Sequence, residues 1–306
     1  MGSDHEVEMS CQSQSIGVQE NVQENVQEKE HEFIEYHLKR NAAARARGEH
    51  GKINTLQGVY AIRRLALNWE PWSGCYMVSD GCKYCYYYGP YSKRYGQNTV
   101  QKTDEFDKPL KKTPKGEFKV QSGKIVPTCF ATDFFIAEAD EWRRDAWKMI
   151  KERSDVEFLI LTKRIERFQI SLPSDWGDGY DNVNLGCSVE DQSSADLRLP
   201  LFLSFPIKRR FIACAPLLGP IDLSRYLDGV EHVTVGGETG REARECEYDW
   251  VLAIRDQCID AGVSFWFKNT GSFFKKDGIV QKVNPYKQGS LAKELGIDIM
   301  NGKKLF

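Results

Sequence analysis

Short apolar runs alternate with amphipathic segments from about residue 55 onward in this chain of 306 residues. Short apolar runs bounded by turn-forming residues are typical of buried strands. Their alternation with helical segments predicts βα units, whose strands pair in parallel within one sheet. The strands that we expect lie at 65–69, 124–130, 156–161, 183–188, 210–214, 232–236 and 263–267.

Two of the segments between these strands have the helical period. Asp140 can cap the first helix and Asp249 the second, which Gly262 would end. The apolar positions that would face the sheet are Trp142, Ala146, Met149 and Ile150 in the first helix and Trp250, Ile254 and Cys258 in the second. About seven βα units in one domain predict an α/β fold with a full or partial (β/α) barrel. A doubly wound open sheet is the competing architecture.

The N-terminal part of the chain differs in composition from the rest. Residues 1–30 are rich in Gln, Glu, Ser and Asn, repeat Asn-Val-Gln-Glu at 21 and 25, and contain few large apolar side chains. Such a segment cannot offset the entropy lost on ordering, so we expect a disordered tail. Residues 31–54 become helical in character and predict an accessory helix or linker, and residues 55–306 form the expected barrel domain.

The overall charge excludes a strong global attraction to nucleic acid or lipid. Forty-two basic residues oppose forty-four acidic ones, which gives a net charge of -2. The first residues are acidic where a secretory signal would be basic and then apolar, and no stretch is apolar enough to span a bilayer. We therefore expect a cytoplasmic protein without a membrane contact. Its nine cysteines then predict reduced thiols rather than a disulfide framework.

Three of these cysteines stand close together, directly after the first expected strand. Cys75, Cys82 and Cys85 form a C-x6-C-x2-C loop. Three thiolates can ligate three irons of a [4Fe–4S] cluster and leave the fourth iron open to an exogenous ligand. The alternatives are a zinc site, for which Cys129 could supply a fourth ligand after folding, and a chance group of buried thiols. Because zinc normally has four protein ligands, this spacing favours an iron–sulfur cluster.

This cysteine loop resembles that of the radical S-adenosylmethionine superfamily. That loop has three cysteines with an aromatic residue before the last, and Tyr84 occupies this place before Cys85. The first gap has six residues where the superfamily usually has three. The resemblance implies a [4Fe–4S] cluster on Cys75, Cys82 and Cys85, bound S-adenosyl-L-methionine, and Tyr84 against its adenine.

A closer resemblance is to an uncharacterised, phage-associated family of radical-S-adenosylmethionine-like proteins. Its members usually have Glu before Pro-Leu-Leu-Gly-Pro, where this chain has Ala215. The shared blocks are Asn-Trp-Glu-Pro-Trp-Ser-Gly-Cys (68–75), Leu-Thr-Lys-Arg (161–164), Leu-Gly-Cys-Ser-Val-Glu (185–190), Pro-Leu-Leu-Gly-Pro (216–220), Val-Gly-Gly-Glu (235–238), Asp-Gln-Cys (256–258) and Phe-Lys (267–268).

The resemblance also implies cofactor contacts at the ends of the strands. Thr132 and Asp133 follow the second strand in a pattern similar to that of photoproduct-lyase-like proteins, and Asp133 could receive the methionine ammonium. The other polar groups expected at the methionine carboxylate and the ribose hydroxyls are Lys163, Ser188, Glu190 and Arg198. Taken singly, each is as readily a helix cap or a surface charge. Gly236-Gly237-Glu238 indicates a close backbone approach, to which a substrate or ribose contact could be added.

The function that these patterns favour is reductive cleavage of S-adenosylmethionine to a 5′-deoxyadenosyl radical. It implies an electron donor such as flavodoxin or ferredoxin. The substrate that the resemblance favours is a nucleic acid or nucleotide, with peptides and small molecules left open. Two other classes stay open: a non-catalytic zinc- or cluster-binding module that recognises nucleic acid, and an electron-transfer protein with a fully ligated cluster.

Overall fold

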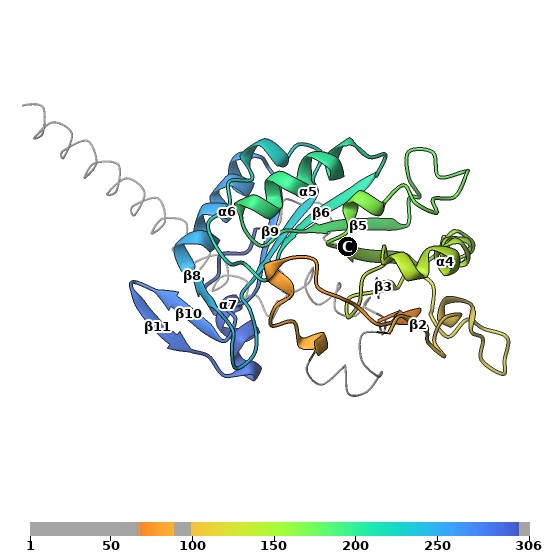
Figure 1. Cartoon of the computed structure of the whole chain (residues 1–306), viewed down its shortest axis with the longest axis horizontal. Coiled ribbons are helices and arrows are strands. Elements are labelled where there is room, and N and C mark those ends of the chain that lie inside the picture. Colours follow the sequence, from red (N-terminus) through yellow and green to blue (C-terminus); the bar gives the residue numbers. More distant parts are fainter. Residues whose placement is uncertain (1–65, 67, 89–98, 300–306) are drawn as a thin grey trace, which may run out of the picture. The chain divides into compact units, whose positions relative to one another are not determined.

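A computed structural model of the chain describes residues 66, 68–88 and 99–299 (Figure 1). The chain divides into two compact units, Met1–Tyr60 and Ala61–Phe306, and every described residue belongs to the second. The expected tail at 1–30 and the accessory helix at 31–54 lie outside the described residues.

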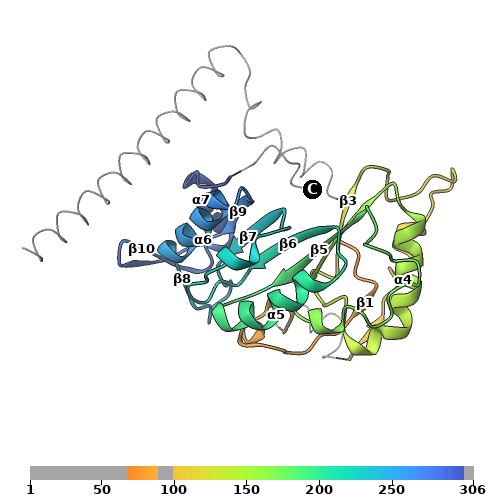
Figure 2. The same ribbon diagram turned by 90° about the horizontal axis from the view of Figure 1, so that it is seen from above.

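The centre of the second unit is a parallel sheet of six strands. They follow one another in chain order, and the sheet curls into half of a barrel (Figures 1 and 2). A doubly wound sheet would reverse the order at its centre, so the half-barrel is the correct alternative. The strands are β3 (Ile125–Thr128), β4 (Glu157–Thr162), β5 (Val183–Ser188), β6 (Arg209–Cys214), β7 (His232–Gly236) and β9 (Ser264–Asn269).

The first expected strand, at 65–69, does not form a regular strand in its described part. Residues Ala66 and Trp69 donate backbone hydrogen bonds to the carbonyls of Ile125 and Pro127, each at 2.8 Å. Trp69 also makes an isolated parallel bridge to Thr128. The segment therefore accompanies β3 at the edge of the sheet without becoming a seventh strand.

The two helices that the sequence predicts, near Asp140 and Asp249, are present, but their capping differs, and two further helices accompany them. They are α4 (Asp140–Glu152), α5 (Gln192–Ser204), α6 (Tyr248–Asp260) and α7 (Gln288–Glu294). The expected caps Asp140 and Asp249 are wrong, because both lie inside their helices and the N-cap residues are Ala139 and Glu247. The end of α6 agrees with the expectation, because Gly262 follows it with a φ of 67°.

The two faces of the sheet carry different apolar clusters. The larger packs the strands against α4, α5 and α6 and includes Trp147, Phe202 and Ile254. A small cluster on the opposite, concave face consists of Ile125, Leu159, Phe211 and Ala213. There the Phe211 ring lies so close to Gly186 that a Cβ on the glycine would come within 2.1 Å of it.

The remaining elements are short. Strands β1 (Trp72–Ser73) and β2 (Gln101–Lys102) pair with each other, and β8 (Glu245–Glu247), β10 (Phe273–Lys276) and β11 (Ile279–Lys282) form a second small sheet. The 3-10 helices are η1 (Asp80–Cys82), η2 (Tyr86–Tyr88), η3 (Lys108–Leu110), η4 (Ala137–Ala139), η5 (Ile165–Arg167), η6 (Ser224–Tyr226) and η7 (Pro285–Lys287). Among the described residues, no helix has the length and apolar character needed to cross a membrane.

Candidate functional site

The cysteine loop, residues 75–85, lies against the carboxyl ends of the parallel strands. It starts after β1 at Gly74, whose amide donates a 2.6 Å hydrogen bond to the Tyr87 hydroxyl. Gly74 has a φ of 94°, and a Cβ there would meet the Thr99 carbonyl at 2.5 Å, so the turn requires glycine. Three side chains then contact the loop: Arg164 after β4, Glu190 after β5 and Arg244 directly before β8.

Arg164, which follows β4, makes the first of these contacts. Its guanidinium donates a 2.7 Å hydrogen bond to the Tyr76 carbonyl and lies over the Tyr76 ring at 4.5 Å. The same group reaches the Cys75 sulfur at 3.9 Å and pairs with Asp133 at 3.1 Å. Because Arg164 is 3% exposed and ion-paired, its guanidinium is fixed in this position.

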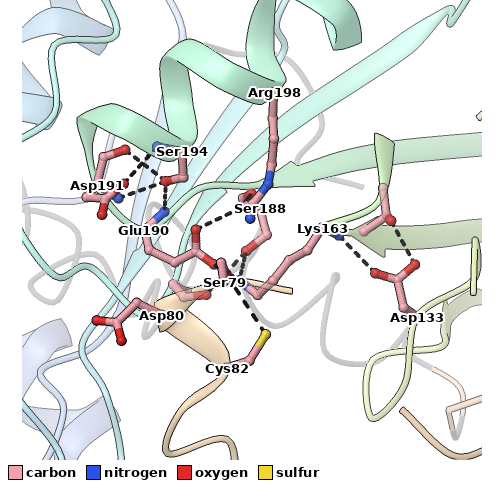
Figure 3. A network of polar contacts seen from close by, with 12 residues as sticks. Ser79, Asp80, Cys82, Asp133, Lys163, Ser188, Glu190, Asp191, Ser194 and Arg198 are labelled. Atoms are coloured by element: carbon pink, nitrogen blue, oxygen red, sulfur yellow. Dashed lines mark hydrogen bonds and ion pairs between the residues drawn. The ribbon is translucent and has the colours of Figure 1, made fainter. Parts of the chain in front are cut away.

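Glu190, which follows β5, makes the second contact (Figure 3). Its Oε1 accepts a 2.6 Å hydrogen bond from the Ser79 hydroxyl and pairs with Lys163 at 2.8 Å, and its Oε2 pairs with Arg198 at 2.7 Å. A Cβ on Gly81 would lie 2.2 Å from the Glu190 side chain, so the loop backbone rests directly on this carboxylate. Burial alone would raise the pKa of Glu190, but Lys163 and Arg198 outweigh it and lower the pKa to about 2.

The expected strand-end residues Lys163, Ser188 and Glu190 meet Arg198 of α5 in one network (Figure 3). Lys163 Nζ donates a 2.7 Å hydrogen bond to Ser188 Oγ, and Arg198 donates one of 2.8 Å to the Ser188 carbonyl. Glu190 thus already accepts from three protein donors, where we expected it to bind a hydroxyl pair. The expected binding of the ribose by Glu190 and that of the methionine carboxylate by Arg198 stay predictions. In each case the cofactor would have to bind beside the protein contacts that the residue already makes.

Arg244, directly before β8 in the connection from β7, makes the third contact. It holds both oxygens of the buried Glu238, at 2.7 and 2.9 Å, and donates to the Asp80 carbonyl at 2.9 Å. It also pairs with the Asp80 carboxylate and lies 5.4 Å from the centre of the Tyr84 ring. Arg244 therefore ties the end of β7 to the cysteine loop.

The Gly-Gly-Glu sequence that precedes this arginine makes a close backbone approach. A Cβ on Gly237 would lie 2.4 Å from the Thr270 carbonyl, and the Glu238 carbonyl accepts a 2.8 Å hydrogen bond from the Ser272 amide. The close-approach interpretation of Gly236-Gly237-Glu238 is thus correct, and Glu238 serves as the partner of Arg244.

Asp133 is buried and contacts four protein donors. Its Oδ1 accepts from the Phe135 amide and the Thr162 hydroxyl, and its Oδ2 accepts from the Lys163 amide and Arg164, all within 2.8–3.1 Å. A carboxylate offers about four acceptor positions. The expected contact with a methionine ammonium stays a prediction, and it would require one of these donors to move away.

Glu70 is a functional candidate that the sequence did not single out. Its carboxylate accepts hydrogen bonds of 2.9 Å from the Ala131 amide and from the hydroxyl of Thr132, one of the expected site residues. Burial raises the pKa of Glu70 to about 7, although these donors act in the opposite direction. Glu70 therefore sits at the end of β3 with a carboxyl group that titrates near neutral pH.

Each thiol of the cysteine loop has its own polar neighbour. Cys75 lies near Arg164, Cys82 lies 3.9 Å from the Ser79 hydroxyl, and the Tyr87 amide lowers the pKa of Cys85 by a hydrogen bond. Burial raises the pKa of Cys75 to about 12 and also raises that of Cys85, and the charge of Cys82 adds to both. Cys82 therefore lies near enough to each of the other two thiols to disfavour their thiolate forms, and a cationic group would stabilise those forms.

These features fit a cubane cluster. Such a cluster binds each cysteine at a different iron, and hydrogen bonds to its sulfurs tune its potential. Among the described residues, no three His, Cys, Asp or Glu side chains converge as they would on one metal ion. A cluster does not require that convergence, because its ligands surround a cube rather than a point. Cys75, Cys82 and Cys85 are the residues that would hold it.

Cys129, considered above as a fourth ligand, lies in a different environment. It is 1% exposed and has a φ of 55°, a backbone conformation that residues other than glycine rarely adopt. Burial, followed by the charge of Glu70, raises the pKa of its thiol, and Thr132 makes a side-chain hydrogen bond with it. This thiol belongs with the Glu70–Thr132 group at the end of β3.

Sequence reasoning missed Arg164, Arg244 and Glu70 as site residues. Arg164 and Glu70 stand inside blocks that the sequence does single out, Leu-Thr-Lys-Arg and Asn-Trp-Glu-Pro, so their position was a usable signal. Arg244 follows β7 in an irregular connection, and its sequence context carries no such signal.

The comparisons with known proteins give one result. A family model described as "Protein of unknown function (DUF5131)" matches residues 61–300. No curated protein and no solved structure matches the chain. The matched residues include the half-barrel and all three contacts of the cysteine loop.

Proposed function

The chain belongs to the DUF5131 family, whose function is unknown, and we propose that it is a radical S-adenosylmethionine enzyme. In this proposal Cys75, Cys82 and Cys85 hold a [4Fe–4S] cluster. When bound, the cluster and S-adenosyl-L-methionine supply a 5′-deoxyadenosyl radical. The half-barrel is then of the radical S-adenosylmethionine type.

The observation that carries the proposal is the way the cysteine loop is held. Three cysteines from one short loop lie at the carboxyl ends of parallel strands, which is where barrel enzymes carry out their chemistry. Arg164, Glu190 and Arg244 hold the loop from the connections after three different strands, at spacings of 88, 111 and 164 residues along the chain. A purely structural loop has no need for a polar neighbour at each of its sulfurs.

The neighbouring residues have distinct tasks in this proposal. Tyr84 contacts the adenine, while Lys163 and Ser188 face the methionine and ribose groups. Lys163 can donate to the cofactor the one N–H that it does not use within the network. Lys163 has three N–H donors and uses two, on Ser188 and Glu190. Arg164 and Arg244 orient the loop, and Trp72 of β1, 0% exposed and just before the loop, helps to exclude water.

The proposal requires an electron donor, such as flavodoxin or ferredoxin. The six-residue gap between Cys75 and Cys82 exposes Tyr76, Met77 and Val78, whose exposed fractions are 37, 53 and 41%. Adjacent exposed apolar side chains are typical of a protein contact, and these adjoin the ligands of the proposed cluster. We place the donor here and the enzyme in the cytoplasm, where such donors and reduced thiols occur.

The test is anaerobic reconstitution of the full chain with iron and sulfide. Expected results are about four irons per chain, the absorbance of a [4Fe–4S] cluster, and 5′-deoxyadenosine once dithionite and S-adenosylmethionine are added. Cys82→Ala should lose both the cluster and the nucleoside. The matched control is Cys258→Ala, which removes a thiol buried in α6 on the other side of the sheet.

Two results would contradict the proposal. A colourless protein that binds one zinc through the loop would favour the zinc-binding module instead. A stable cluster whose electron paramagnetic resonance spectrum does not change with S-adenosylmethionine would favour electron transfer, because a fully ligated cluster leaves no iron open to the added ligand.

A further inference from the structure

A row of side chains crosses the concave face of the half-barrel. The strand register aligns Ser188 of β5 with Ala213 of β6, Ala213 with Thr234 of β7, and Thr234 with Trp266 of β9. Residues in register on parallel strands point to the same side of the sheet. The row thus leads from the Lys163 network on β4 and β5 to Trp266 on β9, a distance of about 14 Å at the usual strand spacing.

Small residues occupy the middle of this row and of the row above it. Between the network and Trp266 stand Ala213, Thr234, Ala215 and Gly236. They are small but covered, because Ala213 and Thr234 are 4 and 9% exposed and a Cβ on Gly236 would lie 3.0 Å from the Asn269 side-chain amide nitrogen and 3.7 Å from the Ala215 Cβ. These residues form a floor of small side chains that leads from the polar network to the exposed Trp266 ring.

Trp266 is exposed where its strand neighbours are not. Its side chain is 40% exposed, while Phe265 and Phe267, which point to the helical side, are 0 and 1% exposed. Strand β9 is the last of the six strands in the sheet, and the strands of a parallel sheet are normally buried on both faces. The open side of the Trp266 ring is therefore available to a flat ligand.

Lys268 stands beside Trp266 at an irregularity of the sheet. The register shifts here so that β7 advances from Val235 to Gly236 while β9 advances from Phe267 to Asn269, which makes Lys268 the extra residue of a bulge. Bulges often re-aim a side chain next to an active site. Lys268 is exposed and makes no ion pair or side-chain hydrogen bond with the described residues, yet desolvation lowers its pKa. Its amine is thus a cation without an ion-pair or hydrogen-bond partner among the described residues.

We propose that the exposed end of this floor binds a nucleotide, with the base stacked on Trp266 and a phosphate paired with Lys268. Base stacking on an aromatic side chain tolerates any base, and a lysine ammonium is a good point charge for phosphate. The nucleotide is either free or part of a nucleic acid strand, since both offer the same base and phosphate. That it is the substrate of the radical rests on the proposed function, whereas its binding does not.

The test measures binding directly, on the full chain with and without the reconstituted cluster. The probes are the four ribonucleoside monophosphates, by calorimetry, and a fluorescein-labelled single-stranded oligonucleotide, by polarisation. Trp266→Ala should weaken binding roughly 5- to 100-fold, as loss of one base stack does, and Trp266→Phe should restore most of it. Lys268→Met should weaken binding and flatten its salt dependence, whereas Lys268→Arg should keep both.

Matched controls separate this site from general effects. Trp250→Ala removes a partly buried tryptophan of α6, and Lys282→Met removes an exposed lysine of β11. Neither should change the affinity. Ala215→Glu is a second test of the floor, because it places a carboxylate next to Gly236 and should repel phosphate without removing any group of the site.

Each outcome decides the matter. Binding to monophosphates that depends on Trp266 and Lys268 supports a free nucleotide, and the same dependence seen with the oligonucleotide alone supports a strand. Wild-type chain that makes 5′-deoxyadenosine but binds neither probe overturns this inference and leaves the proposed function intact. Nucleotide binding by a chain that makes no 5′-deoxyadenosine supports this inference and contradicts the proposed function. If S-adenosylmethionine displaces the nucleotide competitively, the floor belongs to the cofactor and the inference is wrong.

Discussion

Replacing Glu190 with Gln should loosen the cysteine loop and destabilise the protein at neutral pH. The carboxylate is 1% exposed and holds Lys163, Arg198 and Ser79 within 2.6–2.8 Å. Glutamine has the same shape but no charge, so the buried Arg198 and the half-buried Lys163 would lose their counter-charge. Breaking a buried ion pair in this way is strongly destabilising.

The magnitude follows from the lowered pKa. A carboxyl whose pKa falls from 4.5 to about 2 on folding contributes about 3 kcal/mol, at 1.4 kcal/mol per unit. Because the folded pKa is the lower one, this contribution is complete above the unfolded pKa and is lost as the pH falls from about 4.5 to 2. About half of it should remain at pH 3, and glutamine has no such dependence.

Urea unfolding at pH 7 and pH 3, followed by circular dichroism, measures both effects. We expect Glu190→Gln to lose about 3 kcal/mol at pH 7 and about half as much at pH 3. Glu141→Gln, at a surface pair with Arg144 on α4, should change stability by less than about 1 kcal/mol at either pH. A Glu190→Gln variant that is as stable as the wild type at pH 7, or equally impaired at both pH values, would refute this reasoning.

Three further predictions test the site. Gly81→Ala should push the loop off Glu190 and lower the iron content after reconstitution, at a cost of about 1–3 kcal/mol in stability; Gly219→Ala, where a Cβ meets no atom within 4 Å, should do neither. Because the pKa of Glu70 is higher in the folded than in the unfolded state, the wild type should lose up to about 3 kcal/mol of stability as the pH rises from about 4.5 to 7. Glu70→Gln should remove this pH dependence, and the infrared band of the protonated carboxyl should disappear in the same variant. Met77→Asp should slow cluster reduction by flavodoxin about tenfold and leave reduction by dithionite unchanged.

The strands could be predicted because each is a short apolar run bounded by turns. The structure places β5 and β7 at the residues expected, and the other strands of the sheet differ by a few residues at their ends. The capping predictions failed for a tertiary reason. Asp140 precedes an apolar periodicity and has the sequence character of a cap, but Arg143 and Arg167 pair with it, and Arg167 lies beyond the next strand.

The site could be predicted only as a set of strand ends. Parallel strands bring their carboxyl ends to one edge, which is why Lys163, Ser188 and Glu190 meet. Their pairing with one another and with Arg198 depends on side-chain conformations that no pattern encodes. The contact of Arg244 with Asp80 joins residues 164 positions apart, and local sequence carries no information on such a contact.

The same long separations indicate how the cysteine loop behaves in the folded protein. Each of its three contacts depends on a residue that follows a different strand, so the loop has no complete binding surface until β4, β5 and β7 are in place. Contacts between distant parts of the chain lose more entropy on closure than local ones. The sheet has its own apolar clusters and does not depend on the loop. The loop should therefore open as a local unit at a lower free energy than the sheet. Ligation of the proposed cluster by Cys75, Cys82 and Cys85 would add cross-links within that unit, and it should raise the free energy at which the loop opens.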